Sequence, residues 1–258
     1  MYLFLFASFV LGTILGSFIN ALVFRFNTGR GMGGRSRCMH CGHTLSALDL
    51  IPVLSFLFLR GQCRYCGARI SWQYPLVELA AGALALLVYI QIIEATPLWE
   101  GIALYIFWLT VWMTLLFIVV YDIRHGIIPW SVSGFLILLS LVYLFFFTEA
   151  TLWNLLAGPL LALPLFLFSL VSRGTWMGWG DSALELSLGW LLGLTMGLTA
   201  LVLAFWAGAI VGIALIIAKK GFKMKSELPF APFLVLGALA THFFYVDFFA
   251  TLPLLFAL

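Results

Sequence analysis

The sequence predicts an all-α fold: a polytopic membrane helix bundle of about eight transmembrane helices, joined to one small loop domain. Composition is the first reason, because 64% of the 258 residues are hydrophobic and 9% are charged, whereas soluble domains carry about 25% charged residues. The second reason is the repetition of apolar runs of roughly 17 to 25 residues, the length that crosses a bilayer as a helix. The third is a set of four cysteines, all within the longest polar segment.

The apolar runs divide the chain into three regions. No charged residue precedes Arg25, so we expect residues 1–25 to form a membrane helix and not a cleaved signal peptide. Residues 26–72 form a polar module, and residues 73–258 form the rest of the membrane core. The expected spans are 2–24, 75–93, 101–121, 129–147, 153–172, 182–198, 199–218 and 230–250.

The positive charges predict the orientation of the chain. All 13 lysines and arginines lie in loops that alternate along the chain, and the positive-inside rule places such loops in the cytoplasm. Both termini are then expected outside the cytoplasm. The net charge of +3 is too small and too dispersed to indicate a nucleic-acid partner. The basic residues are Arg25, Arg30, Arg35, Arg37, Arg60, Arg64, Arg69, Arg124, Arg173, Lys219, Lys220, Lys223 and Lys225, and the opposite loops carry Glu94, Glu100, Glu149 and Asp247.

The polar module contains two C-x-x-C pairs, Cys38–Cys41 and Cys63–Cys66. Two such turns supply four thiolates at a spacing typical of structural zinc. The alternative is a pair of disulfides, but the expected cytoplasmic location keeps thiols reduced. Glycines 42 and 67 follow the pairs and suit a positive φ. His40 and His43 are expected at the surface, since four thiols already complete a tetrahedral site.

Four carboxylates in or beside the expected spans are candidates for function, because ionisable groups are costly there: Glu78, Asp122, Asp181 and Glu185. Asp122 ends the third span and Asp181 precedes the sixth, so both are expected at the cytoplasmic edge. Two adjacent carboxylates that share a proton can perform aspartic peptidase chemistry. Gly178 and Gly180 would let an extended substrate approach Asp181. The alternative for each aspartate is a helix-end residue that faces water.

The chain resembles the type IV prepilin peptidases of bacteria over most of its length. The motifs that carry the resemblance are Gly16-Ser-Phe-Ile-Asn20, Arg37-Cys-x-x-Cys41, Asp49-Leu-Ile-Pro52-Val-Leu-Ser55, Arg60-Gly-Gln-Cys-Arg-x-Cys66, Ile70-Ser-x-x-Tyr-Pro-Leu-Val-Glu78-Leu, Asp122 with Ile127-Ile-Pro129, Gly178-x-Gly180-Asp181, and Pro229-Phe-Ala-Pro232-Phe.

This resemblance implies an enzyme of the bacterial inner membrane with Asp122 and Asp181 as catalytic aspartates. Members of the family cut the basic leader from type IV prepilins or pseudopilins, which serve pili, secretion or competence. Many then methylate the new N-terminus with S-adenosylmethionine. The longer members carry the tetracysteine module. The family often has a lysine two positions after the second aspartate, where this chain has Ala183.

Several alternatives stay open at this point. Glu185 lies one helical turn after Asp181 and either faces the site or packs, protonated, against another polar helix. Glu78 either binds substrate or the methyl donor, or pairs with an arginine of the module. The whole chain could instead be an intramembrane protease of the wider G-x-G-D type or a zinc-bearing transporter. A transporter predicts carboxylates near the middle of the membrane, whereas both aspartates stand at span ends.

Overall fold

The fold was analysed in a computed structural model, which describes residues 2–27, 34–93, 96–149, 151–175, 177–218 and 228–250. All regular structure in these ranges is helical, and the only β pairing there consists of two isolated bridges, Arg37 with Thr44 and Gln62 with Arg69. The all-α prediction is therefore confirmed. Of the charged residues used to predict orientation, Arg30, Glu94, Lys219, Lys220, Lys223 and Lys225 lie outside the described residues.

Each of the eight expected spans corresponds to one helix. Among the described residues, five helices are long and apolar enough to cross a membrane, and α5, α7 and α9 are shorter. The bounds are α1 Tyr2–Arg25, α3 Gln73–Ile93, α4 Leu98–His125, α5 Trp130–Phe146, α6 Leu152–Val171, α7 Trp179–Leu192, α8 Leu194–Ile217 and α9 Ala231–Phe244.

The boundary between the sixth and seventh helices differs from the prediction. It was expected after residue 198, but the break falls at Gly193, which has φ of 79°. This left-handed conformation favours glycine and ends α7 after Leu192. Apolar residues continue on both sides of the break, so hydropathy does not mark it.

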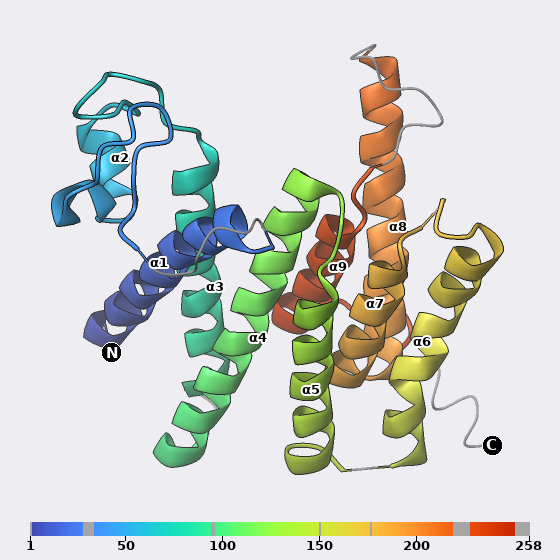
Figure 1. The fold of residues 1–258 in the computed structure, drawn as a ribbon. Coiled ribbons are helices and arrows are strands. Elements are labelled where there is room, and N and C mark those ends of the chain that lie inside the picture. The colour runs from blue at the N-terminus through green and yellow to red at the C-terminus, as the bar shows by residue number, and fades with distance from the viewer. Residues whose placement is uncertain are drawn as a thin grey trace. The chain divides into compact units, whose positions relative to one another are not determined.

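The chain divides into two compact units, Met1–Val120 and Tyr121–Leu258. In the first unit α1 crosses α3 (Figure 1). Glycine makes this crossing close: a Cβ at Gly16 would lie 2.8 Å from the Cα of Glu78, and one at Gly12 would overlap the backbone oxygen of Ala81. The side chain of Asn20, 1% exposed, donates to the carbonyl of Tyr74 at 3.1 Å. The helices are thus joined by backbone packing and by buried polar contacts.

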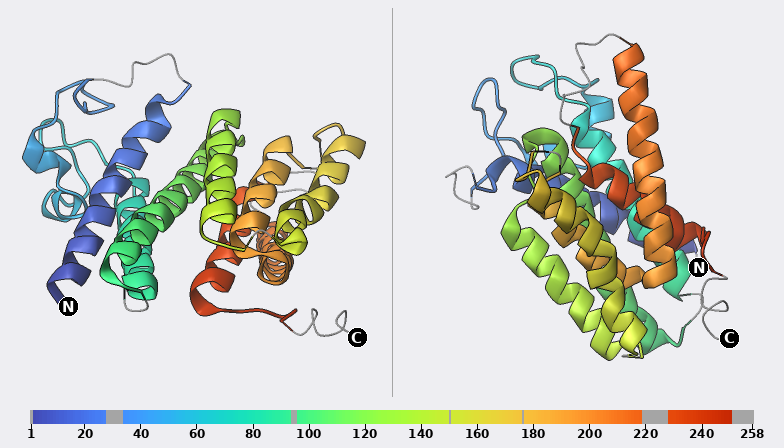
Figure 2. Two further views of the ribbon diagram at one scale, coloured as in Figure 1. Left: turned by 90° about the horizontal axis from the view of Figure 1, so that it is seen from below. Right: turned by 90° about the vertical axis from the view of Figure 1, so that its right-hand side faces the viewer.

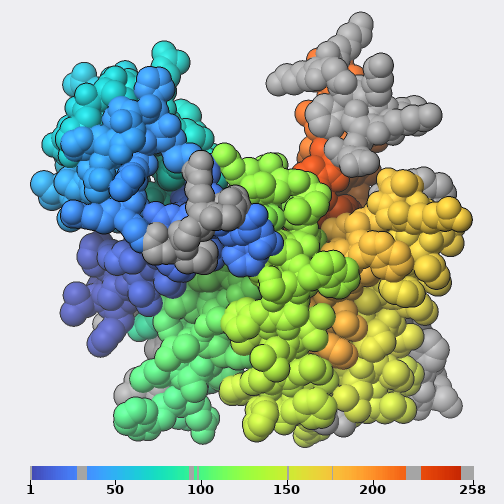
Figure 3. Space-filling view, in the orientation of Figure 1, coloured from blue at the N-terminus to red at the C-terminus, as the bar shows by residue number. Residues whose placement is uncertain are grey.

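The polar module also belongs to the first unit. It contains a short 3-10 helix, η1 (Ala47–Leu50), and one turn and a half of helix, α2 (Leu54–Phe58). In the space-filling view this segment forms a lobe at the end of α3 where that helix begins (Figure 3). Phe56 is buried within it.

In the second unit, α7 is the central helix, since α5, α6, α8 and α9 all contact it. Figure 2 shows α8 extending beyond its neighbours in this unit. Small residues again permit close packing: a Cβ at Gly189 of α7 would lie 2.7 Å from the Cα of Gly158 in α6, and one at Gly237 of α9 would overlap the backbone oxygen of Ala200. The side chains of α7 are consequently enclosed, and two of them are the carboxyls of Asp181 and Glu185.

Candidate active site and cysteine cluster

The four cysteines of the module lie together. One sulfur from each of Cys38, Cys41, Cys63 and Cys66 falls within 4.8 Å of every other, and all four are free thiols. The Sγ atoms of Cys38 and Cys66 are 3.9 Å apart, close to the roughly 3.8 Å edge of a tetrahedron with 2.3 Å metal–sulfur bonds. This donor set fits a metal ion, and the predicted cysteine cluster is confirmed.

Each cysteine pair is shaped by a tight turn. The amide of Gly42 donates to the carbonyl of Cys38, and that of Gly67 donates to the carbonyl of Cys63, both at 2.9 Å. The two glycines have φ of 72° and 70°, as expected from their positions after the pairs. The turns aim the thiols inward and place their amides around the cluster.

Asp49 links the start of η1 to the second cysteine turn, and the sequence motifs alone gave it no role. One oxygen of its carboxylate accepts from Arg64 Nε at 2.7 Å, and the other accepts from the Tyr65 hydroxyl at 3.2 Å and from the backbone and side chain of Ser46. Burial favours the neutral carboxyl, but these hydrogen bonds outweigh it and lower the pKa of Asp49 to about 2. The feature of the sequence that could have indicated this role is the position of Asp49 between the two cysteine pairs.

We expect Asp49→Asn to weaken metal binding by the module roughly tenfold, because groups that orient ligand-bearing segments typically contribute 10- to 100-fold. A chelator competition titration measures this. At a pH above 3.8, the ordinary pKa of aspartate, the charge of Asp49 contributes fully to the stability of the fold. This contribution is lost as the pH falls through about 2, the pKa of Asp49 in the folded protein. The difference from the parent protein should therefore be the same at pH 6 and pH 8. Unchanged affinity would contradict the linking role.

Asp122 lies in the last turn of α4, within the second unit. Its side chain is 5% exposed, and Oδ2 accepts a hydrogen bond from the amide of Ala231 at 3.3 Å. Ala231 is the first residue of α9, where the first amides of a helix have no partner within the helix. The start of α9 therefore holds the carboxyl of Asp122, a contact between residues 109 positions apart.

Asp181 lies in the first turn of α7 and is 7% exposed. Its Oδ2 accepts from the amide of Gly178 at 3.1 Å, so the side chain closes the turn from which the helix starts. The charge of Asp122 acts directly on Asp181. The two aspartates, 59 positions apart in the sequence, thus lie in the same unit and close enough for one charge to act on the other, and a shared catalytic role remains a prediction.

The two glycines before Asp181 have different surroundings. A Cβ at Gly180 would lie 2.7 Å from the Cβ of Ile128, whereas a Cβ at Gly178 would meet the Asp181 carboxyl at 3.3 Å. Gly180 therefore allows the first turn of α7 to pack on the segment that follows Asp122, which helps to bring the aspartates together. Gly178 keeps space beside the carboxyl. Direct substrate contact by either glycine remains a prediction.

Glu185 is fully buried, and neither of its carboxyl oxygens has a hydrogen-bond partner among the described residues. An ionised carboxylate without a partner costs several kcal/mol in such an environment, so we expect the side chain to be neutral. The charge that acts on Asp181 comes from Asp122. Among the described residues no polar group of a neighbouring helix bonds Glu185, so the alternative of a polar helix partner is not supported, and a role of Glu185 at the site remains a prediction.

Replacing Glu185 with leucine is expected to raise the thermal midpoint. A buried polar group without a partner costs about 1–3 kcal/mol, and leucine fills similar space without that cost. Differential scanning fluorimetry of the detergent-solubilised protein measures the shift. The matched control is Ser187→Ala, which removes a buried hydroxyl that does have a partner, the carbonyl of Ala183 at 3.2 Å. A lower midpoint for Glu185→Leu than for the control would contradict the expectation.

Glu78 occupies a separate place in the first unit. Its side chain is 6% exposed, and it accepts from the amide of Val53 at 2.7 Å and from the side chain of Ser17. Val53 has φ of 61° and ψ of −51°, and the amide of Leu54 donates to the carbonyl of Pro52 at 2.6 Å. This is a γ-turn of the rare, strained type. Glu78 thus holds the module through a backbone amide, and a substrate role for it remains a prediction.

Comparison with known proteins agrees with this arrangement. Residues 10–92 match the model of the bacterial peptidase A24 N-terminal domain, and residues 103–213 match that of the type IV leader peptidase family. Proteins named prepilin leader peptidase/N-methyltransferase from Burkholderia pseudomallei (strain K96243) and Bacillus subtilis (strain 168) are each 34% identical to this chain. The alignments cover 94% and 92% of this chain, and 86% and 92% of those proteins. No solved structure matches. The aspartate pair, the cysteine cluster and these similarities together show that the chain belongs to the type IV leader peptidase family.

Proposed function

We propose that this protein is a membrane aspartic endopeptidase that cleaves the basic leader from type IV prepilins or pseudopilins and then methylates the new N-terminus. The single observation that carries the peptidase assignment is the carboxyl pair of Asp122 and Asp181, nearly buried and electrostatically linked. The names of the relatives supply the substrate class and the second activity.

The pair supports general acid–base hydrolysis of a peptide bond. The ionised aspartate takes a proton from water, and the resulting hydroxide attacks the scissile carbonyl carbon. The protonated aspartate donates its proton to the carbonyl oxygen. Collapse of the diol intermediate then breaks the carbon–nitrogen bond: the leaving amine takes up the proton held by the first aspartate, and a diol hydroxyl returns its proton to the second aspartate, which restores the starting pair. The apolar part of the substrate would lie among the membrane helices with its leader outside them.

We propose zinc as the metal of the cysteine cluster. Four protein thiolates leave no open coordination position for water, so the role is structural. A loop of this size has little apolar core, and metal binding would supply much of its folding energy.

We propose S-adenosylmethionine as the methyl donor, because the relatives are named as N-methyltransferases. The module has a hollow on its surface whose lining includes Arg60 and Arg69 and no acidic residue. It offers no carboxylate for the sulfonium cation of this donor.

The location that we propose is the bacterial inner membrane, with the cysteine module and the aspartates on the cytoplasmic side and both termini on the other. The distribution of basic residues supports this orientation. The position of the aspartates supports a peptidase over a transporter, because Asp122 lies in the last turn of α4 and Asp181 in the first turn of α7. Neither interrupts a helix.

The test is incubation of the purified protein, reconstituted in liposomes, with a full-length prepilin and a methyl-labelled donor. We expect release of the leader peptide and transfer of label to the shortened product, both detected by mass spectrometry. Cleavage without label would remove the methyltransferase half of the proposal. Cleavage of unrelated transmembrane segments with the prepilin left intact would favour the wider class of G-x-G-D intramembrane proteases.

A further inference from the structure

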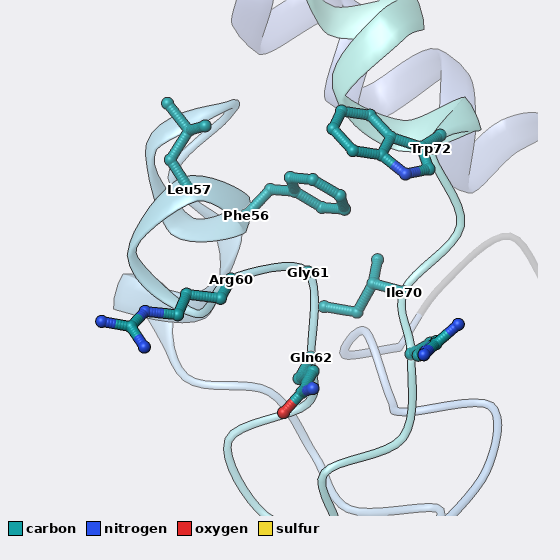
Figure 4. Close-up of a pocket in the computed structure, with 8 residues that line it drawn as sticks. Phe56, Leu57, Arg60, Gly61, Gln62, Ile70 and Trp72 are labelled. Carbon is teal, nitrogen blue, oxygen red and sulfur yellow. The ribbon is translucent and has the colours of Figure 1, made fainter.

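A hollow of about 560 Å³ lies on the polar module, and none of the four cysteines lines it. It is formed by α2 and the turn after it on one side and by the segment that leads into α3 on the other. Figure 4 shows Phe56 and Trp72 side by side, with Gly61 and Ile70 below them and the guanidinium of Arg60 extending away from Trp72. The lining residues are Phe56, Leu57, Arg60, Gly61, Gln62, Arg69, Ile70 and Trp72.

The backbone around the hollow is well defined. Gln62 and Arg69 face each other in an antiparallel bridge, and the amide of Ile70 donates to the carbonyl of Gly61 at 2.7 Å. Arg60 has a φ of 53°, in the left-handed region, where a side chain other than glycine is uncommon. This turn brings the chain from α2 back to the strand-like pair and places arginines on both segments that line the hollow.

The hollow is positively charged, and no acidic side chain among its lining residues neutralises this charge. Neither Arg60 nor Arg69 has an ion-pair partner among the described residues, where the module's acidic Asp49 is already paired with Arg64. No aspartate or glutamate lines the hollow. Guanidinium groups bind phosphate oxygens through pairs of parallel hydrogen bonds. The chemistry therefore favours an anionic phosphate ligand and disfavours a basic leader peptide.

The hollow also lies where lipid headgroups are expected. Trp72 directly precedes α3, one of the helices able to span a membrane, and tryptophan is typical of the membrane–water interface. Trp72 is 67% exposed, and nearby Leu57 and Phe58 are 61% and 82% exposed. An exposed apolar group beside a basic hollow suits a ligand with a charged head and an apolar body.

We propose that this hollow binds the headgroup of an anionic phospholipid, with the positive charges of Arg60 and Arg69 around it attracting the phosphate and Phe56, Leu57 and Trp72 beside the glycerol and first acyl carbons. The site would anchor the module to the membrane surface at the point where α3 enters the bilayer. This proposal rests on the membrane location of α3 and not on the proposed peptidase activity, so either can fail without the other.

The experiment compares lipid binding by native mass spectrometry for the intact protein titrated with phosphatidylglycerol or with phosphatidylcholine. In the variant Arg60→Gln/Arg69→Gln, we expect phosphatidylglycerol to bind roughly 30-fold more weakly. Each arginine near an anionic headgroup contributes about 1 kcal/mol to binding, and the loss of two corresponds to this factor. The matched control is Arg35→Gln/Arg37→Gln, which removes the same charge from residues that do not line the hollow and should weaken binding far less. Phosphatidylcholine binding should be equal in all three proteins.

Three outcomes would overturn the proposal: equal weakening in both double variants, no weakening in either, or full displacement of the lipid by millimolar inorganic phosphate. The last would indicate a free-anion site. Metal content and thermal midpoint serve as checks on folding. If the double variant loses its metal, the single variant Arg69→Gln, which leaves the turn at Arg60 intact, decides the question through the same titration.

Discussion

Asp122→Asn and Asp181→Asn are each expected to lower the rate of leader release by about 10³-fold or more. General acid–base catalysis contributes 10²- to 10⁴-fold, and an amide can neither accept the proton of water nor donate one as a carboxylic acid does. Asparagine keeps the shape of aspartate. The hydrogen bonds that each side chain accepts, from Ala231 to Asp122 and from Gly178 to Asp181, can still form. The loss should therefore appear in the rate of the chemical step, measured in single-turnover assays, with unchanged thermal stability.

The two substitutions should not be additive. Groups that act as one catalytic unit lose most of their effect when either is removed, so the double variant should be about as slow as each single one. Asp247→Asn is the matched control, because Asp247 is also in the second unit but accepts from Thr199 and the amide of Phe249. Retained cleavage in either single variant, or an equal loss in the control, would refute the assignment of the pair.

Removal of the metal is expected to unfold the polar module and leave the membrane helices folded. Structural zinc sites of this kind bind with apparent free energies of about 10–16 kcal/mol, and within the module the described core is small, with Phe56 and Cys63 as its buried apolar side chains. Elemental analysis should give about one zinc per chain. After chelation, limited proteolysis should cut within residues 34–72, while circular dichroism keeps most of its helical signal.

Cys63→Ser tests the same point without a chelator. Cys63 is the buried member of the cluster, and serine is a poor zinc ligand, so this variant should retain less than about a tenth of the metal. His40→Ala is the control, because the four thiols complete the site without it. Normal metal content in Cys63→Ser, or intact resistance to protease after chelation, would exclude a structural zinc role.

Unfolding of the module after chelation also tests how the first unit is held together. Among the described hydrogen bonds of Glu78, the one that joins it to the module comes from the amide of Val53. Chelation should therefore expose this strained turn to hydrogen exchange before it exposes the α1–α3 contact, which depends on Gly12, Gly16 and Asn20. Simultaneous exposure of both would mean that the module and the helix pair form one cooperative unit.

The membrane helices were predictable because each depends on local composition. A run of about 20 apolar residues has one stable form in a bilayer, a helix that satisfies its own backbone, and this holds for α1 or α3 whatever their neighbours are. The cysteine cluster was predictable for a similar reason. Each C-x-x-C turn is local, with glycine in the left-handed conformation directly after it, and two such turns have few ways to combine except around a shared metal.

The remaining features depend on contacts between distant segments. The contacts of Asp49 with the second cysteine turn and of Val53 with Glu78 have no periodicity or spacing that marks them in the sequence. The same is true of the break at Gly193, because apolar residues continue on both sides of it. Only the packing of neighbouring helices determines where such a turn falls.

The sequence by itself determined that this is a helical membrane protein with a four-thiol site, and it identified Asp122 and Asp181 as the candidates for chemistry. Only the tertiary structure decided what surrounds these groups. It brought Asp122 to the start of α9, packed Gly180 on Ile128 beside Asp181, and enclosed Glu185 without a partner. The physical reason is that helix formation in a membrane is a local property of the chain, whereas the environment of a carboxyl depends on which helices pack around it.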